Sequence, residues 1–277
     1  MNSFNQIVLP LFEYSEDKSI LPNPIFHRPW DKLHSRCIEY PFAASQVYDC
    51  NKILDVGTTK SDPTWIAWLE SLPIEVHAID YDKPNFQFKN ITFHESDLRD
   101  IPIDDNSFDI VLAVSVIEHI GLEDPQVFSS KLPKKEIDGD IKAVKELIRI
   151  IKPGGRLVMT LPFGKPDVIA TDKSSRIYTL ETIKEFGRHS TLTSLDYYEY
   201  QYSKYLNVYP EYIPQKRKNL DLQNLFFGRK KGGMRPASIS QLPKHFGVVT
   251  WRKILLEDAS ATHYWHTDGI VCGIWKK

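Results

Sequence analysis

Cysteine is scarce in this sequence, and long apolar runs are absent. The 277 residues contain three cysteines, Cys37, Cys50 and Cys272, without the spacing of metal ligands or of a disulfide framework. Scattered cysteines of this kind are expected to be buried thiols in a reducing compartment, so we predict no metal site. No segment approaches the ~18 apolar residues of a membrane span, and the opening residues lack a basic stretch followed by an apolar core. We therefore predict a cytoplasmic protein with no membrane partner.

An excess of charge of one sign is also missing. The chain has 35 basic and 36 acidic residues, which gives a formal net charge of -1. A chain without a net field does not attract nucleic acid as a whole, so any such attraction must be local. Two basic clusters, at residues 216–218 and 229–231, keep RNA open as an alternative partner. The 42% hydrophobic content is enough for a full core.

The chain divides into an irregular opening and a regular remainder. Residues 1–50 are punctuated by proline and are expected to form a cap on the remainder, with a helix over 33–50 interrupted by Pro41. Residues 51–277 are expected to form one domain, because strand and helix patterns alternate from residue 52 to about residue 163. The expected strands are 52–56, 75–80, 90–97, 108–114 and 155–161, and the expected helices are 63–72 and 140–151.

Strands separated by helices, without tight hairpins, imply right-handed crossovers and a parallel sheet covered on both faces. The predicted fold class is therefore α/β, doubly wound and Rossmann-like. A helix at 179–186, stopped by Gly187, then precedes strands at 191–202 and 268–275. Between these two strands we place a substrate-side insertion at 203–262. The tyrosines at the end of the first strand alternate, so they either line a substrate face or pack the cap against the sheet; they are Tyr198, Tyr200 and Tyr202.

Glycine is scarce where nucleotide-binding loops need it. The loop after the first strand, GTTKSD at 57–62, has a single glycine, Gly57. A P-loop requires G-x-x-x-x-G-K-[ST] and a dinucleotide fold requires G-x-G-x-x-G, so we exclude nucleoside triphosphates and NAD. Asp62 is placed to cap the next helix, and Pro63 to occupy its first turn.

Three aspartates follow consecutive strands and favour a nucleoside without phosphate. Asp55, Asp80 and Asp97 lie at the carboxyl edge of the sheet, where open α/β sheets bind ligands. A carboxylate at the second strand can accept both hydroxyls of a ribose, and Asp97 could accept from an exocyclic amino group. Each aspartate taken alone has another interpretation, in which it satisfies nearby backbone amides or caps a turn.

Four ordered segments resemble the motifs of class I S-adenosylmethionine-dependent methyltransferases, in particular type 11-like small-molecule methyltransferases. They are ILDVG at 53–57, VHAID at 76–80, the run from SDLRD to EHIG at 96–121, and IRIIKPGGRLVMTLPFG at 148–164. The resemblance implies a seven-stranded, mostly parallel sheet with an antiparallel last strand, and S-adenosyl-L-methionine as the cofactor. This chain departs from the family pattern at Thr59 and Ser61, which stand at the later glycine positions.

The resemblance also implies which residues bind the cofactor. Asp55, Gly57 and Thr58 would border its methionine part, Asp80 and Tyr81 its ribose, and Asp97 and Leu98 its adenine, while Ser115 and Val116 would line the floor.

Glu118 and His119 are the candidate catalytic residues, because they follow the fourth strand and so lie at the same edge of the sheet. An imidazole suits a general base for a hydroxyl acceptor, although it could simply pack beside the cofactor. We expect O-methylation of a sugar or another small-molecule hydroxyl, and hence a role in carbohydrate modification. The alternatives are an RNA methyltransferase and a catalytically inactive scaffold of the same fold.

Two further groups of polar residues invite a metal interpretation, which we do not adopt. His263, His266 and Asp268 match no specific metal pattern and are expected at the surface or behind the site. Asp138 and Asp140 are expected to be helix N-caps.

Overall fold

The computed structural model describes most of the chain from residue 35 onward. The described residues are 12–16, 20, 21, 25, 26, 35–123, 128, 133–164, 168, 169, 175–202, 227–230, 233–236, 249–256 and 269–277.

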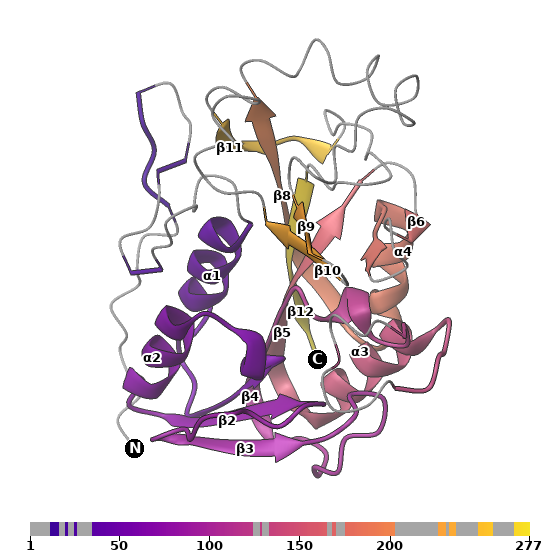
Figure 1. The fold of residues 1–277 in the computed structure, drawn as a ribbon. Coiled ribbons are helices and arrows are strands. Elements are labelled where there is room, and N and C mark those ends of the chain that lie inside the picture. Colours follow the sequence, from indigo (N-terminus) through magenta and orange to yellow (C-terminus); the bar gives the residue numbers. More distant parts are fainter. Residues whose placement is uncertain are drawn as a thin grey trace.

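The centre of the molecule is an eight-stranded sheet in the order β11-β8-β12-β5-β4-β1-β2-β3 (Figure 1). Its strands are β1 (Lys52–Val56), β2 (Glu75–Asp80), β3 (Ile91–Glu95), β4 (Phe108–Val114), β5 (Ile151–Phe163), β8 (Thr191–Tyr202), β11 (Val249–Ile254) and β12 (Gly269–Lys276). Strands β1 to β5 pair in parallel, whereas β12 runs antiparallel to both β5 and β8. The predicted α/β class and the antiparallel last strand are confirmed.

Within the described residues the sheet has one strand more than the seven expected. Strand β11 pairs antiparallel with β8 and forms an edge of the sheet. It lies within the 203–262 insertion, which sequence patterns did not divide further. Two short pairs of strands lie apart from the main sheet, β6 (Val168–Ile169) with β7 (Arg176–Ile177) and β9 (Phe227–Lys230) with β10 (Gly233–Pro236).

Helices cover both faces of the sheet. Figure 1 shows α1 (Arg36–Ser45) and α2 (Pro63–Ser71) on one side, and α3 (Gly139–Ile150) and α4 (Leu180–Glu185) on the other. Three single 3-10 turns are also present among the described residues: η1 (Thr58–Lys60), η2 (Ile117–His119) and η3 (Phe186–His189). Alternate residues of β1 divide between two cores, with Ile53 facing α1 and α2 and Leu54 facing α3 and α4. This alternation is the reason that a strand buried on both sides is a continuous apolar run.

Helix α1 continues through Pro41, where the sequence predicted an interruption. A proline inside a helix removes one hydrogen bond and disfavours the preceding turn. The helix persists because it is buried on almost every side, from Cys37 to Ala44. Tertiary packing here outweighs the local preference.

A buried carboxylate fixes α1 to the carboxyl edge of the sheet. Glu39 is fully buried and accepts hydrogen bonds from the hydroxyl of Ser115, just after β4, and from that of Thr160 in β5 at 2.8 Å. Arg36, one turn earlier, donates to the other oxygen at 2.5 Å. Burial opposes ionisation of Glu39, but the guanidinium and the hydroxyl donors outweigh it, so the pKa of this carboxyl is lowered.

Whether residue 50 is a domain boundary stays a prediction.

The two described tyrosine side chains of β8 pack inside the protein. Tyr198 is fully buried and meets the ring of Phe12 edge to face, with centroids 5.4 Å apart. Tyr197 is buried on the opposite face against Phe163. For Tyr198 the packing interpretation therefore holds, while the side chains of Tyr200 and Tyr202 lie outside the described residues.

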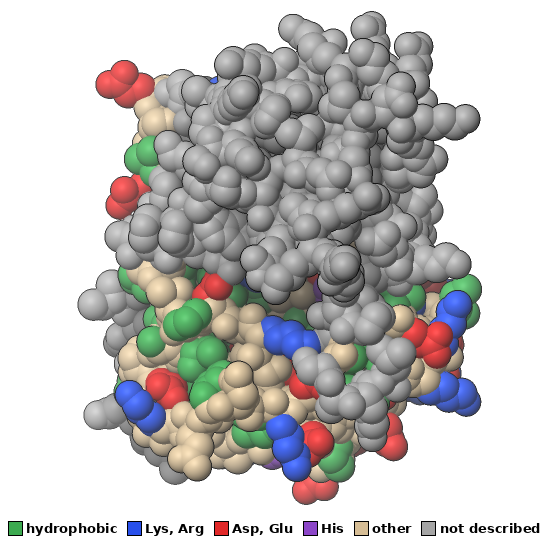
Figure 2. All heavy atoms as spheres, viewed as in Figure 1, with side chains coloured by type: hydrophobic (Ala, Val, Ile, Leu, Met, Phe, Trp, Pro, Cys, Tyr) green, Lys and Arg blue, Asp and Glu red, His purple; other side chains and the backbone are tan. Residues whose placement is uncertain are grey.

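Charge on the described surface is mixed. Figure 2 shows Lys and Arg side chains interspersed with Asp and Glu over the described part of that face, without a large field of one sign. The basic clusters at 216–218 and 229–231 lie outside the described side chains. Within the described residues, no helix is both long and apolar enough to cross a membrane.

We expect the change Glu39→Gln to lower the free energy of unfolding by roughly 3 kcal/mol, because it leaves the guanidinium of Arg36 without its buried counter-ion. Urea unfolding near neutral pH measures this loss, and Glu123→Gln at an exposed position is the control. The lowered pKa of Glu39 means that its ionisation stabilises the fold above the ordinary carboxyl pKa of about 4.5. The difference between wild type and variant should shrink as the pH falls below that value. Equal stability at neutral pH would contradict the role given to Glu39.

Candidate active site

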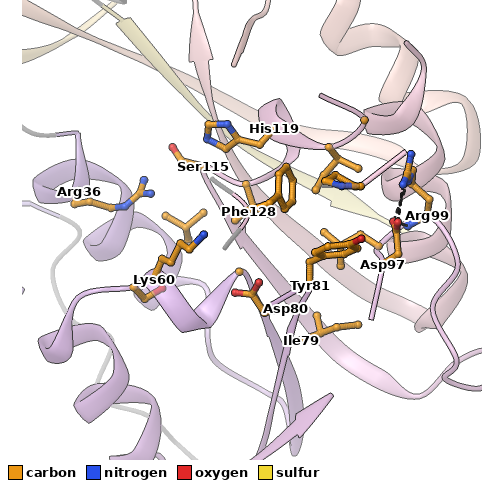
Figure 3. Close-up of a pocket in the computed structure, with 18 residues that line it drawn as sticks. Arg36, Lys60, Ile79, Asp80, Tyr81, Asp97, Arg99, Ser115, His119 and Phe128 are labelled. Atoms are coloured by element: carbon orange, nitrogen blue, oxygen red, sulfur yellow. Dashed lines mark hydrogen bonds and ion pairs between the residues drawn. The ribbon is translucent and has the colours of Figure 1, made fainter. Parts of the chain in front are cut away.

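A cavity lies at the carboxyl ends of β1, β2 and β4, where the sequence placed the ligand site. Its described lining combines the loops after these strands and after β3 with Arg36 at the start of α1, Phe128 and Pro133 (Figure 3). Of the predicted site residues, seven line it together with His119: Gly57, Asp80, Tyr81, Asp97, Leu98, Ser115 and Val116. The ordered motifs therefore meet in one place, although they are far apart in the sequence.

Gly57 is the one position in the loop after β1 that requires glycine. Its φ is +76°, a left-handed conformation that side chains rarely adopt, and its amide donates to the carbonyl of Ile79 at 2.9 Å. A Cβ atom at this position would lie only 2.5 Å from Cγ2 of Val116. The loop thus passes close to the end of β4, and the missing side chain keeps the wall of the cavity open.

Asp55 is bonded within the protein and does not line the cavity. It is 1% exposed, and its carboxylate accepts hydrogen bonds from Thr58 Oγ1 at 2.6 Å and from Trp65 Nε1 at 3.1 Å. Thr58 is itself fully buried. Burial raises the pKa of Asp55 to about 7 despite these two donors. In this structure Asp55 and Thr58 are buried and stabilise the loop through their hydrogen bond. The direct cofactor contact predicted for them stays a prediction.

Asp80 lines the cavity and is held by the same loop. Its Oδ2 accepts from the backbone amide of Thr59 at 3.0 Å and from the Thr59 hydroxyl at 2.5 Å. Its Oδ1 accepts from the amide of Asp82 at 3.1 Å. The carboxylate is therefore fixed before any ligand arrives, and Thr59, which replaces a family glycine, is one of the groups that fix it.

Asp97 is paired with a residue that was not among the predicted site residues. Arg99 donates to it from Nε at 2.9 Å and from Nη2 at 2.6 Å, a bidentate pair that Figure 3 marks with dashes. Arg99 also donates to the carbonyl of Lys134 and lies 3.2 Å from Glu136. Both residues of the pair line the cavity, so Asp97 is an acceptor whose position is set by Arg99. The spacing of two residues along the chain could have indicated this pair.

Apolar side chains form the neighbouring wall. Leu98 is buried, and the ring of Tyr81 meets that of Phe128 edge to face, with centroids 5.4 Å apart. All three residues line the cavity. Such a surface suits a flat aromatic ring system.

Ser115 and Val116, just after β4, also line the cavity. Ser115 has φ +47° and donates its hydroxyl to Glu39, and its amide lies 3.1 Å from both oxygens of Thr160. This left-handed conformation is uncommon outside glycine, and the three bonds hold the residue in place. The chain turns there, out of β4 and into η2.

The two predicted catalytic residues occupy different environments. His119 lines the cavity, whereas Glu118 is 2% exposed and does not belong to the lining. Glu118 Oε1 is 3.7 Å from His119 Nε2, and Glu118 Oε2 has no hydrogen-bond partner among the described residues. Burial, together with the nearby charge of Glu39, raises the pKa of Glu118 to about 8. Glu118 is thus a neutral carboxyl near pH 7, and His119 is the group that an acceptor in the cavity would meet.

Besides Arg99, two further cations in the cavity were not predicted. Arg36 reaches it from α1 with its side chain 21% exposed, and Lys60 reaches it from the loop after β1 (Figure 3). Lys60 is 3.1 Å from Asp82. No signal in the sequence marks Arg36, because its position depends on how α1 docks against the sheet.

A buried arginine braces the segment that carries His119. Arg176 donates to the carbonyl of Ile120 at 2.7 Å and to that of Ile137 at 3.0 Å, and it lies 3.6 Å from Asp140. Asp140 also accepts from the hydroxyl of Tyr178 at 2.9 Å. Asp140 is therefore part of a buried polar cluster rather than an N-cap.

The other predicted N-caps are only positional. Asp138 and Asp62 occupy the N-cap positions of α3 and α2 without making a side-chain cap bond, and Pro63 stands in the first turn of α2 as predicted. His263, His266 and Asp268 lie outside the described residues. Within the described part of the chain, no group of three or more potential ligands is arranged to hold a metal ion.

Comparison with known proteins assigns this part of the chain to a class. Residues 54–134 match the family model described as a methyltransferase domain. A ubiquinone/menaquinone biosynthesis C-methyltransferase of Idiomarina loihiensis is 25% identical over 38% of this chain and 43% of that protein. The enzyme of the same name from Pseudomonas paraeruginosa is 24% identical over 44% of this chain and 40% of that protein. The similarity thus spans less than half of the length of these relatives.

Solved structures of similar fold include the MccD protein, with 14% identity, 82% of this chain and 90% of that chain covered, and a TM-score of 0.44. A second is the 1,6-didemethyltoxoflavin-N1-methyltransferase of Burkholderia thailandensis, with 16% identity, coverage of 53% and 63%, and a TM-score of 0.41.

The motifs, the fold and the family match agree. Residues 54–134 match a methyltransferase domain, in agreement with the resemblance to class I S-adenosylmethionine-dependent methyltransferases, and S-adenosylmethionine is the cofactor of that class.

We expect the buried carboxyl of Asp55 to make the protein less stable as the pH rises. Its pKa is about 7 in the folded protein against an ordinary value of 3.8, so the folded state keeps a proton that the unfolded state has released. The stabilisation is complete below about pH 4 and is lost as the pH rises to about 7, at about 1.4 kcal/mol per pKa unit. Asp55→Asn preserves the shape and has no such proton.

Urea unfolding of both proteins at several pH values between these limits tests the assignment. The stability of wild type relative to Asp55→Asn should fall as the pH rises. A difference that stays constant with pH would contradict the raised pKa.

Proposed function

We propose that this protein transfers the methyl group of S-adenosylmethionine to a hydroxyl of a small molecule, and that a sugar hydroxyl is the acceptor. The observation that carries the proposal is that His119 lines the same cavity as Gly57, Asp80 and Asp97. A nucleoside cofactor and a candidate base for the acceptor hydroxyl would therefore meet there. When bound, the cofactor supplies an activated methyl group on a sulfonium.

The residues of the cavity fit that cofactor. Asp80 offers a fixed carboxylate for the ribose, and the wall made by Tyr81, Leu98 and Phe128 suits the adenine. The open wall at Gly57 leaves room beside the backbone. Arg36 and Lys60 stand on the loop side, where a cation would pair with the cofactor's amino-acid carboxylate.

Acceptor chemistry asks three things of the protein: orientation of the nucleophile, exclusion of water, and removal of a proton if the nucleophile is a hydroxyl. In this chain His119 is the candidate for the third task. Arg176 and the carbonyls that it binds hold the backbone of the His119 segment, and neutral Glu118 lies beside the ring. Glu118 does not belong to the lining of the cavity, so we give it no direct contact with the acceptor.

Small molecules are favoured over RNA as acceptors. The formal charge is close to zero, and the described face in Figure 2 mixes charges of both signs. The names of the curated relatives refer to C-methylation in quinone biosynthesis. A carbon atom of a quinone precursor is therefore the alternative acceptor to a sugar hydroxyl. An inactive scaffold would have no reason to keep Asp80 aimed at the cavity.

We expect the purified protein to bind S-adenosylmethionine, and Asp80→Ala to weaken this binding by roughly 10- to 100-fold, the effect of losing hydrogen bonds to a charged group. Isothermal titration calorimetry measures both affinities, with NAD as the control ligand and Asp104→Ala, at an exposed site, as the control variant. If wild type fails to bind, the methyltransferase proposal fails. If Asp80→Ala binds S-adenosylmethionine as tightly as wild type does, only the ribose contact of Asp80 is rejected.

We expect His119→Ala to lower the rate of methyl transfer by about 100-fold or more while changing cofactor affinity little, because a base acts on the acceptor. Release of S-adenosylhomocysteine, followed with separate panels of sugars and quinone precursors, identifies the acceptor class and gives the rate. His189→Ala, at an exposed histidine, is the control. A His119→Ala variant that turns over at the wild-type rate would exclude this residue as the base. Turnover confined to quinone precursors would reject the sugar hydroxyl.

A further inference from the structure

One of the two oxygens of the Asp80 carboxylate, Oδ2, already accepts two hydrogen bonds within the protein. Oδ2 accepts two hydrogen bonds, one from the amide and one from the hydroxyl of Thr59. Oδ1 accepts a single bond, from the amide of Asp82 at 3.1 Å. An ionised carboxylate has about four lone-pair sites, two on each oxygen. Three are taken, and the remaining one is on Oδ1.

The Thr59 hydroxyl is the group that makes the two oxygens different. The amide of residue 59 is present whatever side chain stands there, so a glycine would still donate one bond to Oδ2. One site on each oxygen would then stay open, and the carboxylate could accept both hydroxyls of a ribose. With threonine, the second site on Oδ2 is filled at 2.5 Å.

The geometry points to Thr59 as a specificity-determining residue: it occupies Oδ2 of Asp80, so that this protein recognises the ribose of its cofactor through one hydroxyl, accepted by Oδ1. The inference rests on the proposed function, because it concerns the same cofactor site. It differs from the sequence-based expectation, in which the carboxylate accepts both hydroxyls.

Loop architecture supports a specific role for this hydroxyl. The neighbouring threonine, Thr58, donates to Asp55 instead, at 2.6 Å, and so stabilises the loop from the end of β1. Thr59 is partly exposed beside the cavity and donates to Asp80, which lines the cavity, whereas Asp55 does not. The two threonines thus bond to the ends of adjacent strands, and only the second affects a group that a ligand can reach.

The test compares the binding of S-adenosylhomocysteine with that of its 2′-deoxy and 3′-deoxy derivatives, by calorimetry. In wild type, one deoxy derivative should bind about tenfold or more weakly, while the other should bind within about threefold of the parent. Thr59→Ala opens Oδ2, so both derivatives should then lose about tenfold relative to the parent. Thr59→Ser keeps the hydroxyl and should restore the one-sided pattern.

Thr64→Ala is the matched control. It makes the same chemical change in the first turn of α2, at a hydroxyl that is buried and has no hydrogen-bond partner among the described residues. This variant should show the wild-type pattern. Melting temperatures of all variants establish that they are folded, and a general loss of structure would weaken binding of the parent and of both derivatives by the same factor.

Two results would overturn the inference: equal penalties for both derivatives in wild type, or a pattern that Thr59→Ala leaves unchanged. Failure of the proposed function is distinguishable from both. In that case wild type would not bind S-adenosylhomocysteine itself, whatever the ribose carries.

Discussion

The buried carboxylate of Glu39 is the interaction on which the candidate site depends. It joins α1 to the end of β4 through Ser115 and to β5 through Thr160, and it pairs with Arg36. A fully buried charge is costly unless every oxygen is satisfied, so this geometry permits little adjustment. Because Ser115 begins the turn into η2, the position of His119 depends on the same bonds. Arg36 enters the cavity for the same reason, since the pairing fixes the first turn of α1.

The loop after β1 solves a packing problem with one glycine. Only Gly57 adopts a left-handed conformation there, where the chain passes Val116. Beyond it the loop needs no further freedom, because Thr58 and Thr59 bond to the aspartates that end β1 and β2. A loop that had to bring its backbone against a pyrophosphate could not carry side chains at these positions. The threonines are therefore compatible with a ligand that has no phosphate, and they replace flexibility with hydrogen bonds.

Sequence patterns predicted the parts of the molecule that are set by local periodicity. The strands 52–56, 75–80 and 108–114 were predicted with the bounds that they have in the structure, since each is a short apolar run between turn signals. The gathering of Gly57, Asp80 and His119 could be predicted from the rule that ligands bind at the carboxyl edge of a parallel sheet. Contacts between distant segments escaped prediction. Glu39 meets Ser115 and Thr160, which are 76 and 121 residues away along the chain, and a glutamate in a helix gives no sign of such partners.

The acid–base character of the site results from an imbalance of charge beneath it. The buried carboxyls of Glu39 and Glu118 both lie near the guanidinium of Arg36. Glu39 has the close contact with Arg36 and two hydroxyl donors besides, so it takes the negative charge. Glu118 then meets both burial and the charge of Glu39, and its pKa rises to about 8. The carboxyl of Glu118 is therefore mostly protonated near neutral pH, and it does not line the cavity. For an acceptor that must lose a proton, His119 is the candidate base, because it is the one of these two neighbours in the chain that lines the cavity.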